Sequence, residues 1–280
     1  TVLGFEGFWN DMNEPAIFFS EYSKGKKGSR FSGDPLYKGG AALSDYKSFS
    51  HDVDGTEVPH WDVHNIFGAK MTEASSEGLE KLLPTRFLLF SRSSYIGAHR
   101  YGGIWTGDNN SSWLMLRRNF TMLPGLNLCG FLYSGADTGG FGGNCSRELL
   151  LRWLALSCFT PLMRDHTTIF TRRQECYRYA GKQDFKAVLS FRYRILPYLY
   201  SEYMKAAIAS DLLFRPLAFA YPTDERAKAV EDELLFGESI LIAPVMEKGA
   251  KGRSVYLPED MTEVRWNGKE FVTREVPQGE

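Results

Sequence analysis

Short apolar runs alternate with longer amphipathic stretches along the first two thirds of the chain. Strands are predicted where four or more apolar residues follow one another, at 2–9, 87–91, 102–105 and 130–133, with a shorter run at 161–163. Helices are predicted where apolar residues recur every three or four positions, at 61–83, 111–123, 148–159 and 184–209. This alternation is typical of α/β proteins with a parallel sheet.

Polar or charged residues and glycine follow each predicted strand. The ionisable residues at these strand ends are Asp11, Arg92, Asp108, Asp137 and His166. In a (β/α)8 TIM barrel the active site lies at the C-terminal ends of the strands, so the pattern favours that fold. About five strand–helix units are visible where a closed barrel needs eight. Either some strands escape detection or the first ones precede residue 1.

The pattern changes after residue 212. Short β segments replace the helices at 239–246, 254–258 and 264–272, and Asn267-Gly268 is a hairpin signal. We therefore predict a barrel part over residues 1–212 and the start of an antiparallel β-sandwich domain over 213–280.

A long polar stretch, 20–55, interrupts the first unit and is typical of a functional or flexible loop. Its basic segment KGKKGSR (24–30) is interpreted as solvated loop rather than as a phosphate site. The DVDG sequence at 52–55 lacks the later ligands of a calcium loop. His60 and His64 have metal-compatible spacing, but no third ligand is evident and they are interpreted as the start of a helix. No metal site is predicted.

Composition narrows the class of protein. The chain of 280 residues is 43% hydrophobic, and 33 Lys and Arg against 34 Asp and Glu give a net charge of −1. No basic stripe indicates nucleic-acid binding, and no apolar run is long enough to span a membrane. Four cysteines without paired spacing favour a reducing compartment, and hence the cytoplasm. Because the chain starts with Thr1 inside an apparent strand, we expect the natural N-terminus upstream, which leaves the localisation open.

Asp11 and Asp108 are candidates for a catalytic pair. Retaining glycosidases use two carboxyl groups, one as nucleophile and the other as acid and then base. The nucleophile must be ionised, so a neighbouring cation is expected, and Arg92 is the candidate. The aromatic rings of Trp9, Trp105 and Phe141 suit the apolar faces of a sugar.

Four motifs resemble glycoside hydrolase family 31, the retaining α-glucosidase family. GFWNDMNEP (7–15) resembles its nucleophile signature. RYGGIWTGDNNSSW (100–113), GFLYSGADTGGFGG (130–143) and MRDH (163–166) resemble three further motifs in the same order. The resemblance implies that strands four to eight of the barrel are present. It places strands one to three and an N-terminal domain upstream, as a part of the same enzyme required for activity.

The resemblance also implies a role for each site residue. Asp11 would be the nucleophile and Asp108 the acid/base. Binding of the sugar would fall to Arg92, Asp137 and His166, in a subsite lined by Trp9, Met12, Trp105 and Phe141. Glu14 is expected to be structural and to orient its neighbours. No metal or organic cofactor is implied.

The function predicted is that of a retaining exo-α-glucosidase acting on short α-linked oligosaccharides. Within the family, α-1,6 linkages, α-xylosides or transglucosylation are alternatives, although the DMNE sequence after Asn10 favours glucosides over xylosides. An inactive sugar-binding homologue and a metal-dependent hydrolase are the readings from other classes. Both carboxylates argue against the first, and the lack of ligand clusters argues against the second.

Overall fold

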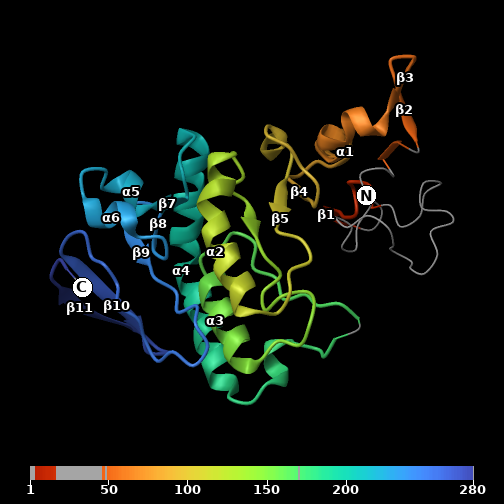
Figure 1. Ribbon diagram of the computed structural model, residues 1–280. Coiled ribbons are helices and arrows are strands. Elements are labelled where there is room, and N and C mark those ends of the chain that lie inside the picture. Colours follow the sequence, from red (N-terminus) through yellow and green to blue (C-terminus); the bar gives the residue numbers. More distant parts are fainter. Residues whose placement is uncertain (1–3, 17–45, 48, 170, 280) are drawn as a thin grey trace. The chain divides into compact units, whose positions relative to one another are not determined.

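The computed structural model describes residues 4–16, 46–47, 49–169 and 171–279. The chain divides into two compact units, Thr1–Ile104 and Trp105–Glu280. Figure 1 labels their helices and strands. None of the helices in the described part of the chain has both the length and the apolar character needed to cross a membrane.

A parallel sheet forms the centre of the first unit. Its strands are β1 (Gly7–Asn10), β4 (Leu88–Ser91) and β5 (Gly103–Trp105), and β4 lies between the other two. The register pairs Phe8 with Leu89 and Trp9 with Phe90. The predicted parallel pairing of successive strands is therefore confirmed, and the strand ends that carry Asp11 and Arg92 are neighbours.

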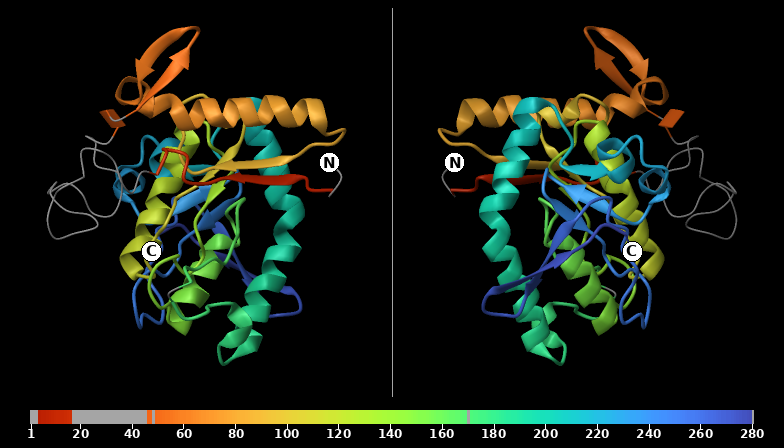
Figure 2. Two further views of the ribbon diagram at one scale, coloured as in Figure 1. Left: turned by 90° about the vertical axis from the view of Figure 1, so that its right-hand side faces the viewer. Right: turned by 90° about the vertical axis from the view of Figure 1, so that its left-hand side faces the viewer.

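Helix α1 (His60–Leu82) runs along β1 and β4 (Figure 2). Glycine permits its close approach, because a Cβ atom on Gly68 would lie 2.6 Å from the Cβ of Ser93. The short 3-10 helix η3 (Ala98–Arg100) then leads into β5.

A hairpin precedes α1 and corrects the prediction of loop up to residue 55. Strands β2 (Ser50–Val53) and β3 (Thr56–Pro59) pair antiparallel. Asp54 and Gly55 turn the chain with positive φ angles of 53° and 79°, and the Gly55 N–H donates to Oδ1 of Asp52 at 2.7 Å. The DVDG sequence thus consists of the last two residues of β2 and a two-residue turn, Asp54-Gly55. The basic segment 24–30 lies outside the described residues.

Three helices lie side by side in the second unit (Figure 1): α2 (Trp113–Leu128), α3 (Arg147–Ser157) and α4 (Lys182–Ala209). A serine caps the N-terminus of each of the first two, because Ser112 and Ser146 accept the N–H groups of Met115 and Leu149. The 3-10 helix η4 (Cys176–Arg178) precedes α4.

The core of the second unit is apolar. Its largest fully buried side chains include Leu116, Phe120, Leu150, Trp153, Phe185, Leu213, Phe214 and Phe236. Cys145 and Cys158 are buried as free thiols. Burial raises the pKa of each thiol to about 12, so both stay protonated and unreactive near neutral pH.

The strand predicted at 130–133 is displaced and shorter. Strand β6 covers only Ser134–Gly135. Gly130, with a φ of 87°, and Phe131 instead donate their N–H groups back to Asn127 and Leu126 at the end of α2. These two residues belong to the helix end, which makes them unavailable to a sheet.

The last part of the chain is antiparallel, as predicted. Strands β7 (Phe214–Pro216), β8 (Leu234–Phe236) and β9 (Ile240–Ile242) form one sheet, with α5 (Leu217–Ala220) and α6 (Glu225–Ala229) between the first two. Strands β10 (Met261–Trp266) and β11 (Phe271–Val276) form a hairpin.

One detail of the prediction for this part is wrong and another is confirmed. Residues 254–258 are not a strand, since only Leu257 pairs there, with Gly279. The hairpin predicted from Asn267-Gly268 is confirmed: Trp266 pairs with Phe271, and in the loop between them Oδ1 of Asn267 accepts the N–H groups of Lys269 and Glu270.

Asn127 ties the end of α2 to β7. Its buried side chain accepts the N–H groups of Leu213 and Phe214 at 3.0 and 2.7 Å and donates to the Phe131 carbonyl at 3.1 Å. Replacing it with alanine removes these three hydrogen bonds from the backbone at the end of α2 and the start of β7.

We expect Asn127→Ala to lower the free energy of unfolding by about 2–4 kcal/mol. Urea denaturation of the complete natural protein measures the change. Asn65→Ala, at an exposed position of α1, is the matched control and should leave stability almost unchanged. Equal effects of the two substitutions would contradict the role given to Asn127.

Candidate active site

The turn after β1 places Asp11 at the end of the sheet in the first unit. Met12 has a φ of 57°, a left-handed conformation that is rare for a residue with its side chain. The Met12 N–H donates to Oδ1 of Asp11 at 2.7 Å. The turn thereby fixes one oxygen of the carboxylate and leaves half of the Asp11 side chain exposed.

Arg92, the residue after β4, binds two carboxylates. Its Nη1 lies 3.0 Å from Oδ1 of Asp11. Its Nε and Nη2 donate to the two oxygens of Glu14 at 2.8 and 2.9 Å. The cation expected beside Asp11 is therefore present, and it is shared with Glu14.

Asn13 locks this turn to the turn after β4. Its buried side chain donates to the hydroxyl of Ser91 at 2.8 Å and accepts the Ser93 N–H at 2.9 Å. The Arg92 N–H also donates to the carbonyl of Asn10 at 3.0 Å. Asp11, Asn13, Glu14, Ser91 and Arg92 are called the Arg92 cluster below.

Two further predicted residues lie beside this cluster. The ring of Trp9 stacks on Phe90, with centroids 4.6 Å apart, and Trp9 is partly buried. The side chain of Met12 is exposed. The first unit thus brings together Trp9, Asp11, Met12 and Arg92.

The second unit contains a buried carboxylate, Asp137, in the loop after β6. Arg164 donates to its Oδ1 through both Nε and Nη2, at 3.0 and 2.5 Å. Its Oδ2 is buried and has no hydrogen-bond partner among the described residues. Burial raises the pKa of Asp137, and the bonds from Arg164 oppose that rise.

The aromatic residues predicted for the sugar subsite lie close to this pair. The guanidinium of Arg164 lies 5.7 Å from the centroid of the buried Trp105 ring. The rings of Phe141 and His166 stack with centroids 5.3 Å apart. The second unit thus places Trp105 and Asp137 against Arg164, and Phe141 against His166, which is near enough to Asp137 to act on its pKa.

Asp108 lies in the loop after β5 and is exposed. Its neighbour Asn109 fixes this loop, because the side-chain Nδ2 donates to Thr106 Oγ1 at 2.8 Å and to the Gly107 carbonyl at 3.0 Å. The Asn109 carbonyl accepts the N–H groups of Phe141 and Gly142. The loop of Asp108 is therefore bonded to the loop of Phe141.

Close packing of these loops requires glycine at 140. Gly140 has a φ of 90°, and a Cβ atom there would lie 2.5 Å from the backbone nitrogen of Ser111. The approach of the two loops thus explains the second glycine of DTGGFGG, Gly140.

Two residues that contact the Asp137 and Phe141 loops were not predicted from the sequence. Arg164 was visible in MRDH, yet only His166 was selected from that motif. Gln174 is almost fully buried and donates through Nε2 to the carbonyls of Gly140, Thr138 and His166 at 2.9, 3.3 and 3.3 Å. In the sequence, Gln174 is recognisable only as a polar residue before a helix, and such residues are too common for one of them to be selected.

His60, one of the two histidines considered as metal ligands, packs instead against His51 and Phe49. His60 is buried, and its Nδ1 lies 2.8 Å from Nε2 of His51, a hydrogen-bond distance. The Phe49 ring stacks on the His60 ring at 4.4 Å. The described residues contain no group of three His, Cys, Asp or Glu side chains that could hold a metal ion.

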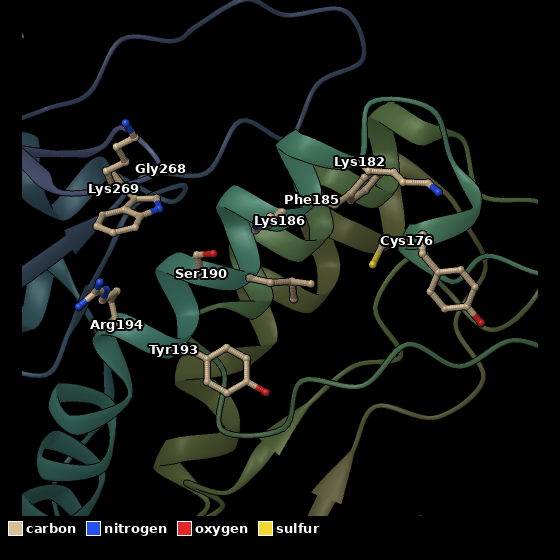
Figure 3. A pocket seen from close by; sticks show the side chains of 12 residues that line it. Cys176, Lys182, Phe185, Lys186, Ser190, Tyr193, Arg194, Gly268 and Lys269 are labelled. Carbon is tan, nitrogen blue, oxygen red and sulfur yellow. The ribbon is translucent and has the colours of Figure 1, made fainter.

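A cavity of about 700 Å³ in the second unit lies between α4 and the β10–β11 hairpin (Figure 3). Its walls carry aromatic and cationic side chains, including Phe185, Lys186, Tyr193 and Arg194. None of the predicted site residues lines this cavity, so the cavity does not support the predicted site.

Comparison with known proteins identifies both parts of the chain. Residues 1–202 match the glycosyl hydrolases family 31 TIM-barrel domain, and residues 210–279 match the C-terminal domain of the same family. The domain boundary predicted at 212 stays a prediction.

Three relatives illustrate the similarity. Alpha-glucosidase 2 of Bacillus thermoamyloliquefaciens is 36% identical over 96% of this chain and 32% of its own length. A crystal structure of the glucosidase II alpha subunit is 26% identical over 96% of this chain and 28% of its own, with a TM-score of 0.75. A cycloalternan-degrading enzyme from Trueperella pyogenes, in complex with a covalent intermediate, is 26% identical over 79% of this chain and 32% of its own, with a TM-score of 0.69. The chain therefore spans about a third of the length of these relatives.

Arg164→Ala would leave the buried carboxylate of Asp137 without its cation. We expect a loss of about 3–5 kcal/mol in the free energy of unfolding, measured by chemical denaturation. Adding Asp137→Asn to the same variant removes the buried charge and should restore part of the loss. No restoration would show that Arg164 acts through other contacts.

Asp165, between Arg164 and His166, makes stability depend on pH. Although the residue as a whole is exposed, desolvation of its carboxyl group raises its pKa to about 6. A hydrogen bond from Gln174 opposes this rise, and the charges of Glu175 and Asp137 add to it. The folded state therefore holds this proton more tightly than the unfolded state, and the resulting stability is lost as the pH rises from about 4 through 6.

Asp165→Asn cannot lose a proton in this range. We expect the difference in Tm, variant minus wild type, to be larger at pH 8 than at pH 4, as measured by calorimetry. The same difference at both pH values would contradict the assignment.

Proposed function

Because the chain belongs to glycosyl hydrolase family 31, we propose that it provides the catalytic residues of a retaining exo-α-glucosidase. The observation that carries the proposal is the carboxylate of Asp11 at a strand end, fixed through Oδ1 by Arg92 and by the Met12 N–H. The relatives named alpha-glucosidase support the substrate class. The proposal concerns the complete natural protein that contains this sequence.

In the first step, an oxygen of Asp11 attacks the anomeric carbon of the terminal α-linked glucose. Asp108 gives its proton to the glycosidic oxygen, whose bond to the sugar breaks, and the remaining saccharide leaves. A β-glucosyl ester on Asp11 results. The covalent intermediate seen in the cycloalternan-degrading relative supports a step of this kind.

In the second step, Asp108 takes a proton from water, and the water oxygen attacks the same carbon from the α face. The ester bond to Asp11 breaks, Asp11 regains its negative charge, and Asp108 is protonated again. The product is α-glucose, so the anomeric configuration is retained.

The other residues bind and orient the sugar in this proposal. Arg92, Asp137 and His166 bind hydroxyl groups, and the unpaired Oδ2 of buried Asp137 is an acceptor suited to one of them. The aromatic faces of Trp9, Trp105 and Phe141, together with Met12, line the glucose subsite. No metal or organic cofactor is needed for either step.

We expect Asp11→Ala to lower kcat/KM by about 10³-fold or more for both maltose and p-nitrophenyl α-glucoside, because no nucleophile remains. In Asp108→Ala the loss should be greater for maltose. The nitrophenolate leaves without help from an acid, whereas the sugar alkoxide of maltose requires a proton.

Three controls delimit the proposal. Wild-type turnover should survive a chelator, and proton NMR should show α-glucose as the first product. Isomaltose and p-nitrophenyl α-xyloside, tested in parallel, separate the alternative preferences within the family. Full activity of Asp11→Ala, or β-glucose as first product, would overturn the mechanism.

A further inference from the structure

We propose that Gln174 is a positioning residue that sets where the Phe141 ring stands relative to His166. It does so through hydrogen bonds from one amide nitrogen to the loops of both residues. The inference rests on the function proposed above, which places Phe141 and His166 in the glucose subsite. Gln174 itself has no contact with the sugar in this proposal.

The amide of Gln174 bridges the two loops. Its Nε2 donates to the carbonyls of Gly140, Thr138 and His166 at 2.9, 3.3 and 3.3 Å. The side chain is only 1% exposed, so water does not replace these bonds. An amide nitrogen carries two hydrogens, which the three carbonyls therefore share. One buried atom thus fixes the backbone before Phe141 and the backbone of His166 together.

Two successive glycines make these bonds necessary. Gly139 and Gly140 both have a φ of 90°, in the left-handed region that glycine adopts without steric cost. Because neither residue has a side chain, sterics restrict this part of the loop little. A Cβ atom on Gly139 would lie 3.2 Å from Nε2 of Gln174, so the amide takes up space that a side chain would need. Hydrogen bonds to Gln174 therefore do here what side-chain sterics do elsewhere.

The peptide group that precedes Phe141 is held on both sides. Its carbonyl accepts the bond from Gln174, with a weaker contact from the Ser111 hydroxyl at 3.5 Å. Its N–H donates to the carbonyl of Asn109 at 2.7 Å. Rotation of this peptide group would move the Phe141 ring, which stacks on His166 with an angle of 29° between the planes. Loss of Gln174 removes the stronger bond on one side and permits that rotation.

The peptide group that follows Phe141 has separate anchors. The Phe141 carbonyl accepts the Thr168 N–H at 3.0 Å and the Thr167 hydroxyl at 3.1 Å. Neither bond involves Gln174, so both remain when it is replaced. We therefore expect a Gln174 variant to keep the loop attached and to change the placement of the ring.

The first experiment is Gln174→Met in the complete natural protein. Methionine has a similar length but no N–H to donate. Misplacement of a substrate-binding group by about 1 Å costs up to about 10²-fold in rate, so we expect kcat/KM for p-nitrophenyl α-glucoside to fall by about tenfold or more. The inhibition constant of glucose should rise by about tenfold, because the binding of the terminal sugar itself is weakened.

Two controls separate positioning from stability. Asn127→Ala also removes three bonds between a buried side chain and the backbone of the second unit, but Asn127 contacts none of the predicted site residues. It should lower Tm and change the inhibition constant of glucose by less than about threefold. Gln278→Met removes one bond from a glutamine Nε2 to the Pro258 carbonyl and should change neither quantity.

The second experiment repeats Gln174→Met in a Phe141→Ala background. If Gln174 acts by placing the Phe141 ring, its replacement has little left to change once the ring is absent. We expect its effect on kcat/KM to shrink below about threefold in this background. An undiminished loss in both backgrounds would overturn the proposal.

A third variant tests a route through Asp165. Desolvation raises the pKa of the Asp165 carboxyl, and a hydrogen bond from Gln174 opposes that rise. In an Asp165→Asn background this bond no longer stabilises a charge, yet the bonds to the loop carbonyls remain. We expect Gln174→Met to lower kcat/KM by about tenfold there too. Disappearance of the effect would assign it to Asp165 and contradict positioning of the ring.

These outcomes separate the positioning role from the proposed function. Turnover that is lost in Asp11→Ala, with glucose inhibition unchanged in Gln174→Met, would sink only the role of Gln174. Turnover that survives Asp11→Ala would sink the proposed function, whatever Gln174→Met does. A lowered Tm with an unchanged inhibition constant for Gln174→Met would give Gln174 a structural role alone and overturn the inference.

Discussion

The polar backbone that follows each short strand must find hydrogen-bond partners outside the sheet, and this constraint shapes both units of the chain. After β1, the turn is bonded through Asn13 to Ser91 and Ser93, which follow or end β4. In the second unit, the carbonyl of Asn109 accepts two N–H groups from the Phe141 loop, and the carbonyl of Phe141 accepts the N–H of Thr168. Within each unit, these turns are thus completed by the next turn or loop along the chain. A change in one of them removes partners from its neighbour, because buried backbone groups tolerate few unmade bonds.

Close approach of backbones explains glycine at two positions. Gly68 in α1 and Gly140 in the loop after β6 stand where a Cβ atom would meet another backbone. Met12 differs from them, since it adopts a left-handed conformation and keeps a long side chain. A glycine would adopt that φ at no steric cost, so the methionine has to be explained by its side chain, which is exposed beside Asp11. That placement is what a lining residue of the sugar subsite would require.

Periodicity predicted the order and type of most long elements, because α1, α2, α3 and α4 are amphipathic over three turns or more. It failed where local hydrogen bonds outweigh hydropathy. The apolar run at 130–133 belongs to the end of α2, since Gly130 turns the chain back onto Asn127. For the candidate site, residue types at strand ends selected Asp11 and Arg92, which the structure places 3.0 Å apart. They could not reveal that Arg92 is shared with Glu14, because the edge by which a guanidinium is bound depends on side-chain geometry.

Arg92 and Arg164 both pair with carboxylates, but the two ion pairs differ in burial and therefore in what they contribute. Arg164 compensates a carboxylate that is removed from water, and without this cation the charge on Asp137 would be costly, so the pair contributes chiefly to a fixed geometry. Arg92 lies between two carboxylates that are both partly exposed, and solvent weakens each attraction. An exposed pair adds little to stability, so stability alone does not explain the geometry of the Arg92 contacts. One cation between two carboxylates leaves the Arg92 cluster with more acidic than basic groups. Under the proposed function, the weaker ion pair would therefore be the one that holds the nucleophile.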